Sequence, residues 1–224
     1  MNVTDAMMRR ISTRAFLDKK VPEALVRTIL ETARYAPSGG NLQPWHVYVL
    51  AGARLTEFLD RVESRRSAGS LGDGTEYAIY PAELTQPYRQ RRSRCAEDMY
   101  ATIGIARDDR PGRLAHFARN FRCFEAPVAL FFAIDRQMGP GQWADLGMFI
   151  QSIMLLACEH GLATCAQEAW AMWHRTIADF VGMPPELTLF CGMALGYADE
   201  AAPINRLRTE RADLGQFVTF EGFE

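Results

Sequence analysis

The sequence lacks an excess of charge of either sign, and it lacks a long uninterrupted apolar run. Its 224 residues carry a formal net charge of −2, so charge gives no reason to expect nucleic acid or an anionic membrane as a partner. A membrane-spanning helix needs about 18 uninterrupted apolar residues, and the nearest segment, 148–166, is broken by Gln151, Ser152, Glu159 and His160. The N-terminal residues also lack the apolar core of a signal peptide.

Motifs for metal, nucleotide and serine-nucleophile chemistry are missing as well. The five cysteines contain no C-x-x-C pair, and the four histidines are isolated from one another. This pattern argues against a disulfide framework and a zinc site, and it is typical of the reducing cytoplasm, where we expect the protein to be. There is no G-x-S-x-G elbow, no P-loop, and no G-x-G-x-x-G between a strand and a helix. We therefore predict neither a metal ion nor a dinucleotide-binding fold.

The composition is that of an ordinary globular chain, with 48% hydrophobic and 23% charged residues. Apolar residues recur at helical spacing in several segments, and short runs rich in Val, Phe and Ile are typical of buried strands. We predict one α+β domain over residues 1–224, with three layers in which helices flank a small mixed sheet. The expected helices are 22–36, 54–67, 93–105, 112–121, 143–160 and 174–181, and the expected strands are 46–51, 127–135, 163–167 and 188–197.

The predicted helix 143–160 is apolar nearly all round. Such a helix is either the central helix of the domain core or has one face in a subunit interface. The C-terminal tail, 203–224, combines arginines with Phe217, Phe220 and Phe223 at three-residue spacing. This tail either lies free, as termini often do, or docks onto a neighbouring chain. We favour a homodimer in which the tail wraps the partner.

Residues 68–95 form a long segment without periodicity, rich in glycine, proline and tyrosine. Loops of this kind are often functional lids or mobile segments, and we expect a surface excursion near the active site. The basic run 89–94 at its end is either the solvated face of a helix or supplies an arginine that steers an aromatic carboxylate.

Arginines gather in two blocks at opposite ends of the chain. The first, RRISTRAF, contains Arg10, Ser12 and Arg14, and the second, NRLRTER, contains Arg206 and Arg208. Each block alone is either a solvated run of charge or part of an anion site. Two arginine forks with hydroxyl groups between them suit a phosphate monoester, because a guanidinium binds phosphate oxygens in pairs.

The stretch between the first predicted helix and the first predicted strand is richer in turn formers and amides than a connector requires. It contains Pro37, Gly39, Asn41, Gln43 and Pro44. Prolines fix φ, glycine lets backbone approach a ligand closely, and the amides offer donors and acceptors without bulk. The loop is either a well-capped helix end with a tight turn or part of a ligand site.

Four segments, in order and at the right spacing, resemble the signature blocks of the FMN-dependent nitroreductase family. They are RRISTRAF, APSGGNLQPWHVYVL, GLATCAQEAW and GMALGYADEAAPINRLRTER. The resemblance covers essentially the whole chain except the excursion. The last two blocks look most like those of the nitroaromatic and nitrobenzoate reductases of the family.

The resemblance implies an intertwined homodimer with two FMN sites at its interface, each built from both chains. The arginine blocks would hold the phosphate and ribityl end, the loop would reach across from the partner, and the backbone near Glu168 would approach flavin N5. Ala166 and Ala169 stand where many members have proline and glycine. The positions implied to contact FMN are Arg10, Ile11, Ser12, Arg14, Pro37, Ser38, Gly39, Asn41, Gln43, Asn120, Arg122, Gln167, Glu168, Ala169, Arg206 and Arg208.

The resemblance also implies the reaction. FMN would take a hydride from NADH or NADPH and pass electrons to a small aromatic acceptor in a ping-pong cycle. No acid or base side chain stands out, so we assign no catalytic residue, and arginines at the flavin would stabilise its anionic reduced form. The alternatives are a reductive dehalogenase or flavin-processing enzyme of the same fold, and a flavin-binding protein without catalysis.

Overall fold

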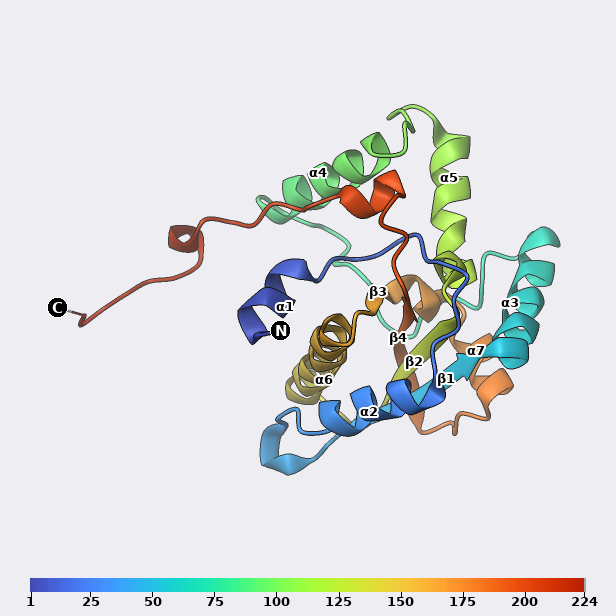
Figure 1. Ribbon diagram of the computed structural model, residues 1–224, viewed down its shortest axis with the longest axis horizontal. Helices are drawn as coiled ribbons and strands as arrows, with labels where there is room; N and C mark the ends of the chain where they lie inside the picture. Colours follow the sequence, from blue (N-terminus) through green and yellow to red (C-terminus); the bar gives the residue numbers. More distant parts are fainter. Residues whose placement is uncertain (224) are drawn as a thin grey trace.

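A computed structural model describes residues 1–223, which fold around one four-stranded sheet (Figure 1). The strands are β1 (Trp45–Ala51), β2 (Val128–Asp135), β3 (Ala163–Gln167) and β4 (Leu187–Gly196), in the spatial order β1-β2-β4-β3. The helices are α1 (Val3–Arg9), α2 (Glu23–Ala33), α3 (Gly52–Ser67), α4 (Tyr88–Ala101), α5 (Arg110–Ala118), α6 (Pro140–Glu159) and α7 (His174–Val181). Short 3-10 turns are η1 (Gly39–Asn41), η2 (Arg119–Glu125), η3 (Glu168–Met172), η4 (Pro203–Arg206) and η5 (Leu214–Gln216).

The two central strands, β2 and β4, are buried on both faces because their sequences are apolar almost throughout. Every neighbouring pair of strands runs antiparallel. This corrects the expectation of a mixed sheet, since parallel pairing in residues 1–223 is limited to isolated bridges, Ser12 with Thr164 and Gly74 with Trp173. An apolar run reports that a strand is buried and does not report its direction.

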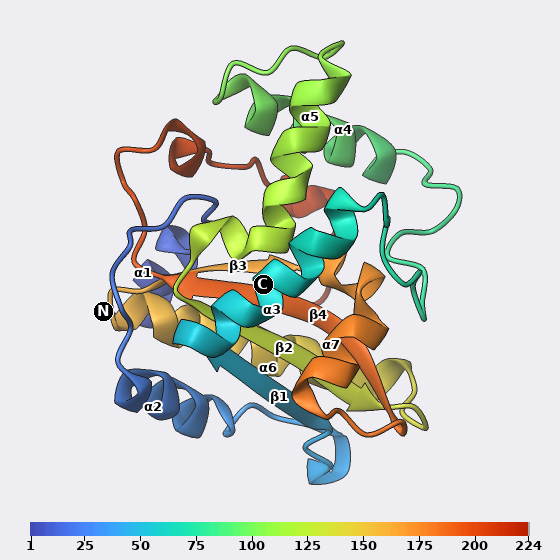
Figure 2. The same cartoon turned by 90° about the vertical axis from the view of Figure 1, so that its right-hand side faces the viewer.

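Two hydrophobic clusters lie on opposite faces of the sheet. One joins α2 and α6 to Leu130 and Phe132 of β2, and the other joins α3, η2, η3 and α7 to Ala129 and Phe131. Alternate residues of β2 therefore face opposite layers, as strand geometry requires. Figure 2 looks onto the side of α3 and α7, with the sheet behind them and α6 beyond it. The three predicted layers are confirmed.

The long helix α6 has a core face and a partly exposed face. Leu146, Phe149 and Ile153 are among its buried residues, whereas Met148 is 40% exposed. The helix is therefore the central helix of its layer and also leaves apolar surface uncovered in a single chain. None of the helices in residues 1–223 is long and apolar enough to cross a membrane.

Element boundaries differ from the prediction mainly in the N-terminal half. The helix expected from residue 93 is α4, which begins at Tyr88, and α1 was not expected at all. Both are polar or short: α4 has no buried residue, and α1 is a single capped stretch in which Asn2 accepts a hydrogen bond from the Asp5 N–H at 2.8 Å. Neither carries the apolar stripe that identifies a helix in a sequence.

The C-terminal tail leaves the body after η4 and extends away from it (Figure 1). Its first part lies along α4, where Arg94 pairs with Glu210 at 2.6 Å and Arg91 donates to Gln216 at 2.8 Å. Its last part exposes three phenylalanines, Phe217 at 68%, Phe220 at 64% and Phe223 at 82%.

Candidate functional site

The two arginine blocks, which lie at opposite ends of the sequence, meet at one edge of the sheet. Ser12 and Thr13 run beside β3, where the Thr13 N–H donates to the Thr164 carbonyl at 2.9 Å. η4, with Arg206, lies against the same segment. The structure therefore brings together the residues 10–14 and 206–208, as the phosphate-site hypothesis requires.

The residue that joins the two blocks is Asn205, which was not predicted. Its side chain is buried, with 6% exposed. Asn205 Oδ1 accepts from the Arg14 N–H at 2.8 Å, and its amide donates to the carbonyls of Ala15 and Asp199, each at 2.8 Å. An asparagine inside the second arginine block was the available signal, but its partners Arg14 and Ala15 lie 191 and 190 positions away.

The arginines of this cluster, which consists of Arg9, Arg10, Arg14, Arg206 and Arg208, form no ion pair within 4.0 Å with an Asp or Glu side chain of residues 1–223. Arg9, Arg206 and Arg208 line a hollow of about 1160 Å³, together with Ile11 and Glu200. The guanidinium groups that make internal hydrogen bonds use backbone carbonyls instead, as when Arg14 donates to Ser12 at 3.2 Å and Arg208 to Asn205 at 3.0 Å. Such a cluster favours an anionic ligand.

The strand beside the cluster, β3, presents unsatisfied polar atoms. Thr164 Oγ1 and Gln167 Oε1 are buried without a hydrogen-bond partner. The Gln167 amide donates to the Asn120 carbonyl at 2.8 Å and to the Asn120 side chain at 3.2 Å. Because Gln167 Nε2 donates to the Asn120 carbonyl, Gln167 Oε1 is the side-chain atom without a partner. Buried polar groups normally find partners, so these orphans fit a ligand with its own hydrogen-bonding groups.

The turn that follows β3 carries Glu168 and Ala169, both partly buried. Burial raises the pKa of the Glu168 carboxyl. Cys158, which also lines the hollow, has a pKa raised by burial, so it stays a neutral thiol at ordinary pH and offers no activated nucleophile. The donor set of this region, with arginines, hydroxyls and amides, suits a phosphorylated ligand with a polar ring edge.

The loop 37–44 is held in one rigid conformation. Gly40, Asn41 and Gln43 have positive φ values of 57°, 57° and 48°, an uncommon and strained state for the two amide residues. Ser38 closes the loop: its hydroxyl accepts from the Gln43 N–H at 3.0 Å and its carbonyl from the Asn41 N–H at 2.9 Å. The Gln43 side chain donates to the Asn41 carbonyl at 3.2 Å. The side chains of Pro37, Asn41 and Gln43 remain exposed.

A buried carboxylate anchors this loop to α6. Asp145, 6% exposed, accepts a hydrogen bond from the Gly39 N–H at 3.1 Å. Asp145 lies in the first half of α6, whereas Cys158 near its end lines the hollow. At 1.5 Å per residue the two positions are about 20 Å apart along the helix. The Gly39 anchor of the loop is therefore remote from the hollow that the arginine cluster of the same chain lines.

The Arg122 side chain does not join the arginine cluster. Its guanidinium pairs with Asp60 of α3 at 3.5 Å, whereas its neighbour Asn120 contacts Gln167. The basic run 89–94 lies on α4, where Arg92 stacks on the Tyr80 ring at 4.1 Å. Residues 1–223 contain no group of three or more His, Cys, Asp or Glu side chains arranged for a metal ion.

Comparison with known proteins agrees with this geometry. The model of the Nitroreductase family matches residues 7–197. The chain is 36% identical over 219 residues to chloronitrobenzene nitroreductase of Comamonas testosteroni, covering 97% of this chain and 96% of that one. It is 37% identical over 218 residues to 4-nitrobenzoate reductase of Pseudomonas putida, covering 96% and 93%.

Among solved structures, the FMN- and NADPH-dependent nitroreductase NfnB of Sphigopyxis sp. strain HMH superposes with a TM-score of 0.96 at 48% identity, with both chains covered completely. NfnB of Mycobacterium smegmatis, solved in complex with NADPH, gives a TM-score of 0.92 at 27% identity and 98% coverage of each chain. The match of the family model and the identity over nearly the full chain show that this protein belongs to the nitroreductase family.

Proposed function

We propose that this protein is an FMN-dependent nitroreductase that uses NADH or NADPH to reduce small nitroaromatic compounds. The observation that carries the proposal is the arginine cluster, in which two blocks from opposite ends of the chain meet at one hollow and form no ion pair with a carboxylate in residues 1–223. The relatives named above are nitroaromatic reductases, and the similar structures are FMN-dependent.

In this proposal the chain binds and orients the cofactor. Arg10, Ser12, Arg14, Arg206 and Arg208 hold the phosphate and the ribityl chain, and Ile11 packs beside them. Gln167, Glu168 and Ala169 lie along the ring, with Gln167 Oε1 and Thr164 Oγ1 as free acceptors for its hydrogen-bonding groups. Bound FMN supplies the redox chemistry, accepting hydride from the nicotinamide and passing electrons to the nitro group. Nearby guanidinium groups favour the negative charge that reduction leaves on the cofactor.

We further propose that two chains build each site. Within one chain the Gly39 anchor of the loop lies in the first half of α6 and the arginine-lined hollow lies at its end, which supports a site that the loop of a second chain completes. The exposed Phe217, Phe220 and Phe223 and the uncovered side of α6 favour the same homodimer. Pro37, Ser38, Gly39, Asn41 and Gln43 would then wall the partner's flavin with preformed, rigid backbone.

The acceptor and the compartment complete the proposal. The relatives act on chloronitrobenzene, nitrobenzene and 4-nitrobenzoate by their names, so neutral and carboxylated nitroarenes are the substrates to compare. A reductive dehalogenase of this fold would prefer a halophenol, and a flavin-binding protein would show no bleaching of FMN by NADPH under argon. We place the protein in the cytoplasm, because all five of its cysteines are free.

The decisive experiment measures FMN affinity in Arg14→Ala and Arg208→Ala. Each variant removes charge-assisted contacts to phosphate worth about 1.5–3 kcal/mol, so FMN should bind about 10- to 100-fold more weakly while the fold is retained. The matched control is Arg61→Ala, an exposed arginine of α3 on the other side of the sheet, which should bind FMN like the wild type. Wild-type affinity in both cluster variants would refute the phosphate assignment.

A further inference from the structure

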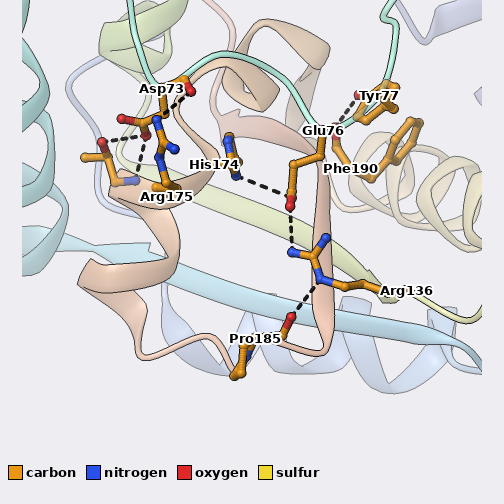
Figure 3. A network of polar contacts seen from close by, with 9 residues as sticks. Asp73, Glu76, Tyr77, Arg136, His174, Arg175, Pro185 and Phe190 are labelled. Carbon is orange, nitrogen blue, oxygen red and sulfur yellow. Dashed lines mark hydrogen bonds and ion pairs between the residues drawn. The ribbon is translucent and has the colours of Figure 1, made fainter.

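The first half of the excursion is fastened to the body of the protein. We call residues 72–77 the strap; they cross the junction of η3 and α7 (Figure 3). The side chain of Asp73 in the strap is 4% exposed. Its Oδ2 accepts from the Thr176 N–H and hydroxyl, each at 2.8 Å, and its Oδ1 accepts from Arg65 at 3.0 Å.

These contacts make Asp73 the N-terminal cap of α7. The helix begins at His174 without a side-chain cap of its own, so the N–H groups of its first turn need acceptors from elsewhere. Asp73 supplies one from 103 positions earlier in the sequence, and its negative charge suits the positive end of the helix. Arg175 of α7 donates in return to the Asp73 carbonyl at 2.8 Å.

The backbone of the strap is joined to η3 in the same place. The Asp73 N–H donates to the Met172 carbonyl at 2.6 Å, and Gly74 forms a bridge with Trp173. Gly72 has a φ of +116°, and a Cβ atom there would lie 2.4 Å from the Met172 oxygen. Only glycine permits this approach. The strap therefore holds the C-terminal end of η3, whose N-terminal end is formed by Glu168.

The other end of the strap is attached to different elements. Glu76 accepts from Arg136 at 2.6 Å and lies 3.4 Å from His174 Nδ1. The Tyr77 hydroxyl donates to the Phe190 carbonyl at 2.5 Å. These contacts reach the end of β2, α7 and β4 (Figure 3), whereas Asp73 alone joins the strap to both η3 and α7 through its side chain and backbone.

We infer that Asp73 is a positioning residue for the redox reaction. Its side chain fixes the strap to Thr176 and Arg65, and the strap backbone, held in place by this, binds the Met172 carbonyl of η3 and so positions the backbone of Glu168 and Ala169 that faces the flavin. The inference rests on the proposed placement of FMN beside η3. Asp73 does not touch the cofactor in this assignment. It acts through the Met172 end of a turn only five residues long, in which a shift at one end is passed to the other.

The test compares Asp73→Ala and Asp73→Asn with the wild type, all loaded with FMN. Stopped-flow reduction at saturating NADPH should be about 10- to 100-fold slower in Asp73→Ala, because a misplacement of about 1 Å at the reacting centre costs this much. Asp73→Asn should lie between, since its amide oxygen can still accept from the Thr176 N–H. The affinity for FMN should change less than about threefold, because the arginine cluster is untouched, and the reduction potential of bound FMN should shift.

Two controls separate positioning from stability. Asp179→Asn changes an exposed aspartate on α7 and should behave like the wild type. Ile177→Ala opens a cavity under α7 and costs about 2–5 kcal/mol, without altering the strap. The inference is overturned if Asp73→Ala keeps the wild-type rate and potential, if it loses FMN affinity instead, or if Ile177→Ala reproduces its kinetic loss. Should Asp73→Ala fail to fold, Asp73→Asn and Thr176→Val decide by the same readouts. Failure of the wild type to bind FMN would refute the proposed function and is measured first.

Discussion

Replacing Asn205 by alanine should weaken folding and FMN binding together, because one buried side chain joins the two arginine blocks. The substitution leaves the Arg14 N–H without its 2.8 Å acceptor and removes one of two donors from the carbonyls of Ala15 and Asp199, which keep bonds from the N–H groups of Asp199 and Ala202. An unsatisfied buried group costs about 1–3 kcal/mol, and each other lost hydrogen bond about 0.5–1.5 kcal/mol. Water at the rim of the hollow will satisfy part of this, so we expect a loss of about 2–5 kcal/mol in the free energy of unfolding. For a chain of this length that corresponds to a Tm lower by roughly 5–15 °C.

The informative readout is FMN affinity, measured by quenching of flavin fluorescence at a temperature where the variant is folded. Asn205→Ala should bind FMN more weakly than either Arg14→Ala or Arg208→Ala, because it releases both segments at once. The matched control is Asn2→Ala, which removes an exposed cap of α1 and should cost about 1 kcal/mol of stability without affecting FMN. If Asn205→Ala were destabilised yet bound FMN like the wild type, Asn205 would be a structural residue only, and the reasoning that the two blocks act as one site would fail.

Three further predictions follow from particular contacts. A Cβ atom on Gly192 would lie 2.3 Å from the buried Trp170 ring. Gly192→Ala should therefore lower the free energy of unfolding by about 1–3 kcal/mol, measured by denaturant titration. An unchanged midpoint would contradict the packing of β4 on η3. Burial alone would raise the pKa of Asp73, but its hydrogen bonds from Thr176 and Arg65 outweigh burial and lower the pKa. The stabilisation from the charged carboxylate is therefore present above the unfolded pKa of about 4 and lost at lower pH. The Tm difference between wild type and Asp73→Asn should shrink from about pH 5 to pH 2, and a constant difference would refute the charged contact. Truncation after Gln216 removes Phe217, Phe220 and Phe223 but keeps Arg206 and Arg208. Sedimentation should show a weaker dimer, because each buried phenylalanine contributes about 1.5–3 kcal/mol. An unchanged dimer would show that the tail does not bind the partner chain.

The sequence was most informative where burial alone decides the structure. The apolar runs that became β2 and β4 are buried along nearly their whole length, and the segments predicted as helices that became α2, α3 and α7 each bury one face. Burial has a period along the chain, and the period survives in the sequence. The direction of a strand leaves no periodic signal in the sequence. The sheet was therefore expected to be mixed, whereas all its strand pairs are antiparallel.

Features that depend on contacts between distant positions could not be predicted. Asn205 and Asp73 each satisfy backbone groups more than a hundred positions away, and neither looks different from a surface polar residue when only its neighbours in sequence are considered. The same holds for Gly72, where a carbonyl of η3 and not a local turn requires glycine. The strap was therefore predicted only as part of a surface excursion, although residues of α3, η3, α7 and β4 hold it.

Each arginine block alone is either solvated charge or part of an anion site, and in the structure the two blocks lie together. A run of arginines at a surface is ordinarily solvated or paired, and Arg113 with Glu97 at 2.7 Å is an example elsewhere in the chain. The chain has 27 acidic residues for 25 basic ones, and Glu200 even lines the hollow, so acids were available to neutralise the cluster. Like charges about 8 Å apart in water repel by roughly 0.5 kcal/mol per pair. Arginines from both ends of the chain lie together at this edge of the sheet without an ion pair in residues 1–223, and buried Asn205 joins their segments. This arrangement supports the proposed site for an anion that comes from outside the chain.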